Sequence, residues 1–175
     1  TVGDVNEAPT VDDALLEVPE NSDAGTFVGV AAGVDPDNGD TLTYYITAGD
    51  QSGVFTIGAD SGEITVAPGA ALNHEDIDGF LLTVIVEDVL GLSASASVSV
   101  SVEDENEPPV ADDSVFQIME NSDPGTEVGN VTGIDPDDGE VLRFSILDSE
   151  PEGGFVIDGL TGTLSVAPSA FISHE

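Results

Sequence analysis

The chain has 175 residues, and its formal net charge is −35 at pH 7 because 36 residues are Asp or Glu and Arg143 is the only Lys or Arg. Such a surface repels nucleic acids and anionic membranes, both of which bind proteins through basic side chains. No run of about 18 apolar residues predicts a membrane span, and no basic segment leading into an apolar one predicts a signal peptide. We therefore expect the chain to be a piece of a longer, strongly acidic protein.

Seven segments with strand character follow one another between residues 14 and 102, separated by Gly, Pro, Asp and Asn. The last is the clearest, because Ala or Val alternates with Ser, which places one face in the core and the other in water. No segment has helical periodicity over three turns, although Ala70–Leu72 could form a short turn before Asn73. The predicted strands are Ala14–Val18, Thr26–Val34, Thr41–Thr47, Val54–Ile57, Glu63–Val66, Phe80–Asp88 and Leu92–Val102.

Seven short strands in about 100 residues favour an immunoglobulin-like β-sandwich, so the predicted fold class is all-β. Only nine residues are aromatic (two Tyr, seven Phe), so the core must be built from Val, Ile, Leu and Ala.

The sequence repeats itself after 100 residues without a gap, and 32 of the 75 overlapping positions are identical. A period of this length indicates a tandem array of whole domains. We expect residues 1–7 to be the end of a preceding repeat and its linker, 8–103 a complete sandwich, and 104–107 a linker. Residues 108–175 are then the first part of a second, truncated sandwich that lacks its last two strands. Such a piece should fold poorly alone unless another chain supplies strands.

The joint between the two copies carries four acids within five residues, Glu103, Asp104, Glu105 and Glu107, followed by two prolines. The prolines exclude a helix or a central strand, and the carboxylates repel one another, so the joint needs a cation from solution. Ca²⁺ takes six to eight oxygen ligands, which this chain clusters at the ends of its predicted strands. Glu20, Glu75 and the Asp135-Pro136-Asp137 loop would lie at facing ends of two stacked sandwiches.

These residues resemble the cadherin repeat, in the variety common in large bacterial surface proteins. Pro19-Glu20-Asn21 is similar to the family's x-Glu-x motif, and Leu72-Asn73-His74-Glu75 to its Leu-Asp-Arg-Glu. Asp104-Glu105-Asn106-Glu107-Pro108 is similar to its Asp-x-Asn-Asp-Asn linker, and Asp135-Pro136-Asp137 to its Asp-x-Asp. The resemblance covers the first copy and the incomplete second one.

The resemblance implies Ca²⁺ ions between consecutive domains, held by side chains and by carbonyl oxygens of the linker. At the central joint the implied ligand positions are Glu20, Asn73, Glu75, Asp104, Glu105, Asn106, Glu107, Asp135 and Asp137. At the preceding joint they are Asp4, Asn6, Glu7, Asp35, Asp37 and Asp88. Because Asn73 stands where the family has Asp and the second copy ends before its counterpart of Asp88, we expect two ions at the central joint rather than three.

Enzyme chemistry is not indicated. His74-Glu75 begins like a zinc-protease motif, but position 78 is Asp, and no nucleophile elbow or phosphate loop occurs. The resemblance implies a calcium-dependent structural or adhesion module of an extracellular, cell-surface protein. Its implied partners are neighbouring repeats, with further copies of the chain or surface glycans as other candidates. The alternative is a calcium-dependent carbohydrate-binding module, for which only Tyr44 and Tyr45 could form a sugar platform, and one of these should be core.

Overall fold

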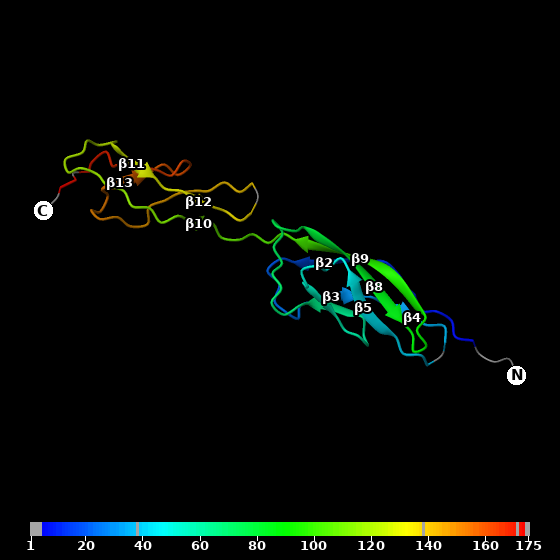
Figure 1. Ribbon diagram of the computed structural model, residues 1–175. Helices are drawn as coiled ribbons and strands as arrows, with labels where there is room; N and C mark the ends of the chain where they lie inside the picture. The colour runs from blue at the N-terminus through cyan, green and yellow to red at the C-terminus, as the bar shows by residue number, and fades with distance from the viewer. Residues whose placement is uncertain (1–4, 38, 138, 171, 174–175) are drawn as a thin grey trace. The chain divides into compact units, whose positions relative to one another are not determined.

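The structure is a computed structural model and describes residues 5–37, 39–137, 139–170 and 172–173. The chain divides into two compact units, Thr1–Glu105 (unit 1) and Asn106–Glu175 (unit 2), each of which is described by itself. Every regular element in the described ranges is a β-strand, which confirms the all-β prediction (Figure 1). None of these residues forms a helix long and apolar enough to cross a membrane.

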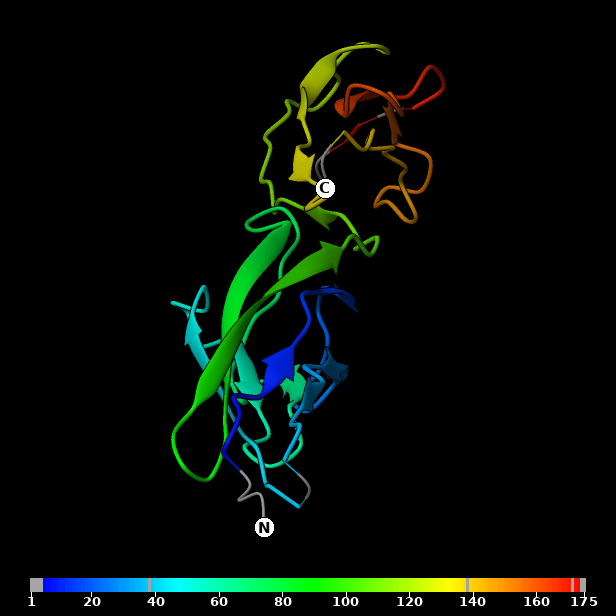
Figure 2. The same ribbon diagram turned by 90° about the vertical axis from the view of Figure 1, so that its right-hand side faces the viewer.

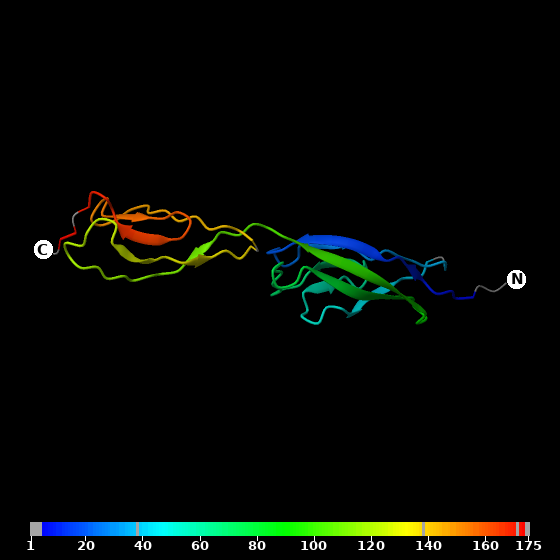
Figure 3. The same ribbon diagram turned by 90° about the horizontal axis from the view of Figure 1, so that it is seen from above.

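Unit 1 is a sandwich whose larger sheet has four strands in the order β2-β9-β8-β5. These strands are β2 (Ala14–Pro19), β5 (Thr43–Ala48), β8 (Gly79–Glu87) and β9 (Ser93–Glu103). β2 runs parallel to β9, whereas the other pairs are antiparallel; Figure 3 shows β2, in blue, alongside β9, in green. β2, near the start of the unit, therefore lies directly beside β9, the last strand of the unit.

The second sheet of unit 1 has the order β3-β7-β6 and contains β3 (Phe27–Val30), β6 (Phe55–Ile57) and β7 (Glu63–Val66). A separate short pair joins β1 (Thr10–Val11) to β4 (Gly33–Val34). The prediction of one strand over Thr26–Val34 is therefore wrong. The segment breaks at Ala31, whose N–H donates to Gly62 O at 2.9 Å, and the chain then leaves the β3 sheet to pair with β1.

The β8–β9 hairpin supplies six of the fifteen buried residues of the hydrophobic core of unit 1, and Figure 2 shows its two long strands side by side. Its residues pair from Gly79 opposite Ser101 to Glu87 opposite Ser93. The predicted alternation along β9 is confirmed, because its valines are buried while its serines are exposed or half-buried. The inward side chains of the hairpin are at most 2% exposed at Leu82, Val84, Val86, Val98, Val100 and Val102.

Gly62 is required where the loop before β7 passes close to the chain beyond β3. Its φ is +68°, and a Cβ there would collide with the carbonyl oxygen of Ala31. Gly162 repeats this arrangement in unit 2, with φ +73° and the carbonyl oxygen of Val131 in the way. The sequence repeat is thus a repeat of backbone geometry.

Unit 2 reproduces two of the three sheets of unit 1. β10 (Val110–Ala111) pairs with β12 (Gly133–Ile134), and β11 (Glu127–Asn130), β14 (Thr163–Val166) and β13 (Phe155–Ile157) form a sheet in the order β11-β14-β13. The four-stranded sheet has no counterpart among the described residues of unit 2. Segments 114–119 and 143–148, which are equivalent to β2 and β5 in the sequence repeat, are not strands.

Candidate metal sites

Three aspartates meet at one end of unit 1. Asp35 follows β4, Asp40 precedes β5 and Asp88 directly follows β8, and one carboxylate oxygen from each lies within 4.8 Å of the others. Asp88 is only 5% exposed, and the other two are half-buried. We call these three residues the N-terminal cluster.

Asp88 is held rigidly by neutral donors. Its Oδ2 accepts a hydrogen bond from Asn6 Nδ2 at 2.7 Å, and its Oδ1 accepts the N–H groups of Leu90 and Leu92 at 2.8 and 2.9 Å. Burial raises the pKa of Asp88, but these hydrogen bonds outweigh it and lower the pKa below the ordinary value. Asp88 is therefore ionised at neutral pH.

The other two aspartates each keep one oxygen uncompensated. Oδ2 of Asp35 and Oδ2 of Asp40 are covered from solvent and have no hydrogen-bond partner. Burial raises the pKa of Asp40, and the charges of Asp35, Asp37 and Asp88 raise it further. Covered carboxylate oxygens without a partner are costly, and a hard divalent cation with oxygen ligands removes that cost. The donor set therefore fits Ca²⁺.

Each unit ties its own linker residues to its own Asp-x-Asp loop. In unit 1 the N–H of Glu7 donates to Asp37 Oδ2 at 2.7 Å. In unit 2 the N–H of Glu107 donates to Asp137 Oδ2 at 2.9 Å. The two linkers thus enter their domains in the same way.

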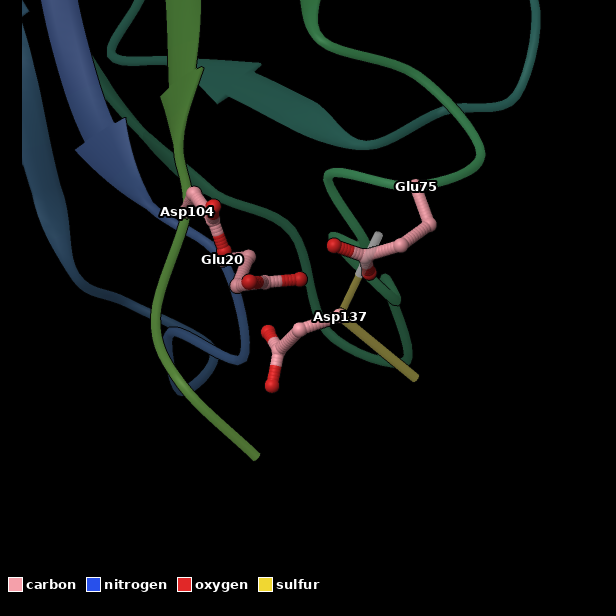
Figure 4. Close-up of side chains that lie close together, drawn as sticks. All are labelled: Glu20, Glu75, Asp104 and Asp137. Carbon is pink, nitrogen blue, oxygen red and sulfur yellow. The ribbon is translucent and has the colours of Figure 1, made fainter. Parts of the chain in front are cut away.

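A second group of carboxylates, the C-terminal cluster, lies at the other end of unit 1 and consists of Glu20, Glu75 and Asp104 (Figure 4). One oxygen from each lies within 4.8 Å of the others. Glu20 follows β2 and Asp104 follows β9, and the parallel register that pairs Pro19 with Glu103 sets these two acids side by side. Figure 4 also labels Asp137, which belongs to unit 2.

Glu20 is the fixed member of the C-terminal cluster, because it is 2% exposed and both its oxygens accept main-chain hydrogen bonds. Oε1 accepts the N–H of Glu105 and Oε2 accepts the N–H of His74, each at 2.8 Å. Glu20 therefore joins the exit of β9 to the turn that carries Glu75. Oε2 of Glu75 is covered and has no hydrogen-bond partner, as at the N-terminal cluster.

The turn that presents Glu75 is closed by Asn73, whose Oδ1 accepts the N–H of Asp76 at 2.8 Å. The short turn expected at Ala70–Leu72 instead occupies residues 74–76. His74 Nδ1 donates to the carbonyl oxygen of Val102 at 2.7 Å. That bond raises the pKa of His74; burial opposes it, and the charges of Asp104, Glu75 and Glu20 add to the rise.

The structure brings together five of the predicted ligand residues within unit 1, namely Glu20, Glu75 and Asp104 at one end and Asp35 and Asp88 at the other. Sequence reasoning missed Asp40. A signal was available, because an acid follows Gly39 in the first copy and Glu140 stands at the same place in the second. Asp4 lies outside the described residues, and Asn6 presents its amide nitrogen to Asp88.

Residues 15–103 and 114–169 match the family model described as Cadherin domain. The chain belongs to the cadherin family. The expected resemblance is therefore confirmed, and so is the expectation of a non-enzymatic module. The first matched range begins within β2, and the second begins at segment 114–119, which is equivalent to β2.

Similar cadherins include Protocadherin Fat 4 of Mus musculus, 34% identical over 95% of this chain and 4% of that protein. Protocadherin-7 of Homo sapiens is 32% identical over 99% of this chain and 17% of that protein. The chain thus spans less than a fifth of either relative.

Among solved structures, human CDH23 EC21-23 matches with a TM-score of 0.74 and 25% identity, over 97% of this chain and 56% of that one. The protocadherin gammaB7 EC3-6 cis-dimer matches with a TM-score of 0.66 and 28% identity, over 96% and 45%.

The tyrosines that could have formed a sugar platform do not lie together on the surface. Tyr44 is 7% exposed and packs in the core, whereas Tyr45 is 45% exposed. The expectation that one of them is core is confirmed. A single half-exposed tyrosine is a poor platform for a sugar ring.

Proposed function

We propose that these cadherin domains are a calcium-stiffened segment of an extracellular structural or adhesion protein. The observation that carries the proposal is the N-terminal cluster, where three carboxylates converge and two covered oxygens have no partner. Unit 1 contains no Lys or Arg to neutralise them. Bound Ca²⁺ would supply the positive charge that the carboxylates lack.

The residues of unit 1 divide between two sites in this proposal. At the N-terminal end Asp35, Asp40 and Asp88 hold one ion, beside the linker residues Asn6 and Glu7. At the C-terminal end Glu20, Glu75 and Asp104 hold another, and Asp135 and Asp137 of unit 2 are proposed to complete it. The sequence repeat supports the last step, because Asp35 and Asp37 stand next to a linker in unit 1 as Asp135 and Asp137 do in unit 2. The remaining ligand positions stay predictions: Asp4, Asp37, Asn73, Glu105, Asn106 and Glu107.

Stiffening follows from electrostatics. Carboxylates held about 5 Å apart repel one another, so without metal each cluster pushes its own elements apart. When linker and domain residues share an ion, the angle between successive domains becomes fixed. Extracellular calcium modules bind with dissociation constants of about 10⁻⁴–10⁻³ M. At a calcium concentration of about 10⁻³ M the sites should therefore be almost saturated at the tight end of this range and about half occupied at the weak end.

Calorimetric calcium titration of the full chain tests the sites, and small-angle scattering with and without chelator tests the stiffening. Asp88→Asn should abolish uptake at one site and Glu20→Gln at the other, while Asp60→Asn, an exposed acid in neither cluster, should change nothing. Absence of calcium uptake by the unmodified chain would overturn the proposal. Uptake with an unchanged scattering profile would remove the stiffening role alone.

The proposal also covers the partners of the chain, its location and the kind of organism it comes from. The similar protocadherin gammaB7 EC3-6 is a cis-dimer, which supports contacts between copies of a cadherin chain. Ultracentrifugation in millimolar calcium tests this, and a persistent monomer counts against it. An extracellular location follows if calcium at these concentrations is needed, whereas a bacterial source, glycan partners and the carbohydrate-binding alternative stay predictions of the sequence.

A further inference from the structure

The outward face of the four-stranded sheet of unit 1 carries two rows that contain apolar side chains. In the first row Leu15 and Leu81 flank Ser99, which pairs with both, and the two leucines are 87% and 64% exposed. In the second row Ile85 pairs with Tyr45, which is 45% exposed. β8 and β9 each have two strand neighbours, and their inward side chains are buried. This face is therefore not the vacant position of a further strand.

Hydroxyl groups fill the space between the two apolar rows, and charge lies at the margins. Ser97 pairs with Thr83 in the middle row, and none of the described side chains in the three rows is charged. Glu17 lies beyond the first apolar row and Glu87 beyond the second. At the edge of the sheet the carboxylate of Asp13 accepts the N–H of Ser97 at 2.7 Å. We call the three rows the neutral face.

The charge pattern favours a second copy of the chain as the partner of this face. Unit 1 contains 13 Asp, 8 Glu and no Lys or Arg, so two copies repel one another wherever their acids meet. That repulsion is smallest at the neutral face. A basic partner would instead be drawn to the surrounding acids, because complementary charge selects the surface of encounter.

The order of the rows is self-complementary. Apolar, hydroxyl and apolar rows follow in the same order from either end of the strands. A two-fold axis that crosses the strands at the middle row therefore lays each apolar row on the other and the hydroxyl row on itself. Glu17 and Glu87 lie two strands apart in the order β2-β9-β8-β5, about 10 Å sideways, so this axis does not set them directly opposite each other.

We propose that the neutral face is a self-association surface, on which two copies of the chain pack face to face about this axis. Each copy offers about 400 Å² in projection, from four strands about 4.8 Å apart and three rows of about 6.7 Å. This is about half of what one partner contributes to a stable interface, so a single contact is weak. The proposal names a surface for the contacts between copies considered above, and it does not require calcium.

Ionic strength should control the association. The net charge of −35 opposes pairing, and at 1 M salt this repulsion is screened within about 3 Å. With chelator present throughout, we therefore expect monomers in about 0.05 M NaCl and dimers in about 1 M NaCl. Sedimentation of the full chain at both salt concentrations measures the difference.

Single cysteines test the axis, because the chain has no cysteine of its own. Thr83→Cys places two thiols at the axis, so in about 1 M NaCl a glutathione redox buffer should link the copies about ten-fold faster than it links Thr56→Cys. Thr56 is the matched control, since it is exposed on β6 in the other sheet. Leu81→Asp, added to the Thr83→Cys chain, should slow cross-linking about ten-fold because it places a charge in the contact. Leu160→Asp, at a leucine 61% exposed in unit 2, should not.

Equal rates for the two cysteine variants, or equal effects of the two aspartate substitutions, would mean that copies associate elsewhere, for example through the half-buried apolar side chains of unit 2. Either result would overturn the proposal, and so would a monomer in 1 M NaCl. A dimer in chelator supports it even if the chain takes up no calcium. Calcium uptake without a dimer would remove the self-association surface alone.

Discussion

Glu20 and Glu120 are the same residue in the same motif, yet the first is 2% exposed and the second is exposed. The local backbone does not explain the difference, since the following Asn21 and Asn121 adopt left-handed conformations with φ of 55° and 59°. Glu20 is buried because the end of β9 runs beside it: Glu20 N–H donates to Glu103 O at 2.9 Å, and Glu105 N–H donates to its side chain. A motif thus becomes a site only when a distant strand closes over it.

The largest expected contrast between the units lies in their cores. Ile64→Ala should cost unit 1 about 2–5 kcal/mol, because Ile64 is 0% exposed and its removal leaves a cavity. Leu164→Ala at the equivalent, half-buried position of unit 2 should cost about 1 kcal/mol, since water already reaches it. Hydrogen exchange resolved by segment would read each unit separately. Equal losses would contradict the open core of unit 2.

The next largest difference between the two units should be their stabilisation by calcium. At a tenfold excess over the dissociation constant, one ion stabilises the folded state by about 1.4 kcal/mol. Glu20→Gln should remove this increment from unit 1, whereas Glu120→Gln, the matched control, should leave it in place. The increment is measured as the difference between melts with and without calcium within each variant, so that any effect of the substitution on the metal-free fold cancels.

A smaller effect is expected at the loop before β6. Asp50 accepts the N–H groups of Val54 and Phe55 at 2.7 and 3.0 Å. Asp50→Ala should therefore destabilise unit 1 by about 1 kcal/mol in urea unfolding. Glu150→Ala is the control in unit 2, because Glu150 is exposed and should lose almost nothing. An equal response of the two variants would mean that these bonds contribute no net stability.

The smallest effect is a pH dependence in chelator. The pKa of His74 is raised above its ordinary value by the bond to Val102 and by three neighbouring carboxylates, against burial. Its stabilising contribution is therefore complete below about pH 6.5 and is lost as the pH rises through the folded-state pKa. Unit 1 should melt lower at about pH 8 than at about pH 6. His74→Asn should flatten this slope. An unchanged slope in that variant would refute the assignment.

The sequence predicted the sandwich because its signals are local. Alternation in Ser93–Val102 identifies a half-buried strand, and the repeat at 100 residues identifies the tandem arrangement. It did not predict the crossing at Ala31, because a continuous apolar run carries no mark of the point where a strand changes sheet. β1, with two residues, is too short to show a period.

The two carboxylate clusters were predicted only in part, because some of their residues are brought together by tertiary structure alone. Glu20, Glu75 and Asp104 stand in motifs that can be read from the chain, whereas Asp40 belongs to no such motif and joins Asp35 and Asp88 only through folding. Which oxygens remain uncompensated also depends on tertiary packing. Asp88 has its two oxygens occupied by donors from two different segments.

The parallel register of β2 and β9 decides how unit 1 responds to mechanical load. If the chain is pulled from its two ends, the entering and leaving strands are drawn in opposite directions, and six paired positions from Ala14 opposite Val98 to Pro19 opposite Glu103 are sheared together. Bonds loaded side by side must break at once, whereas bonds in a hairpin peel apart one after another. A load applied along the chain would therefore act on the β2–β9 pair of unit 1 in shear.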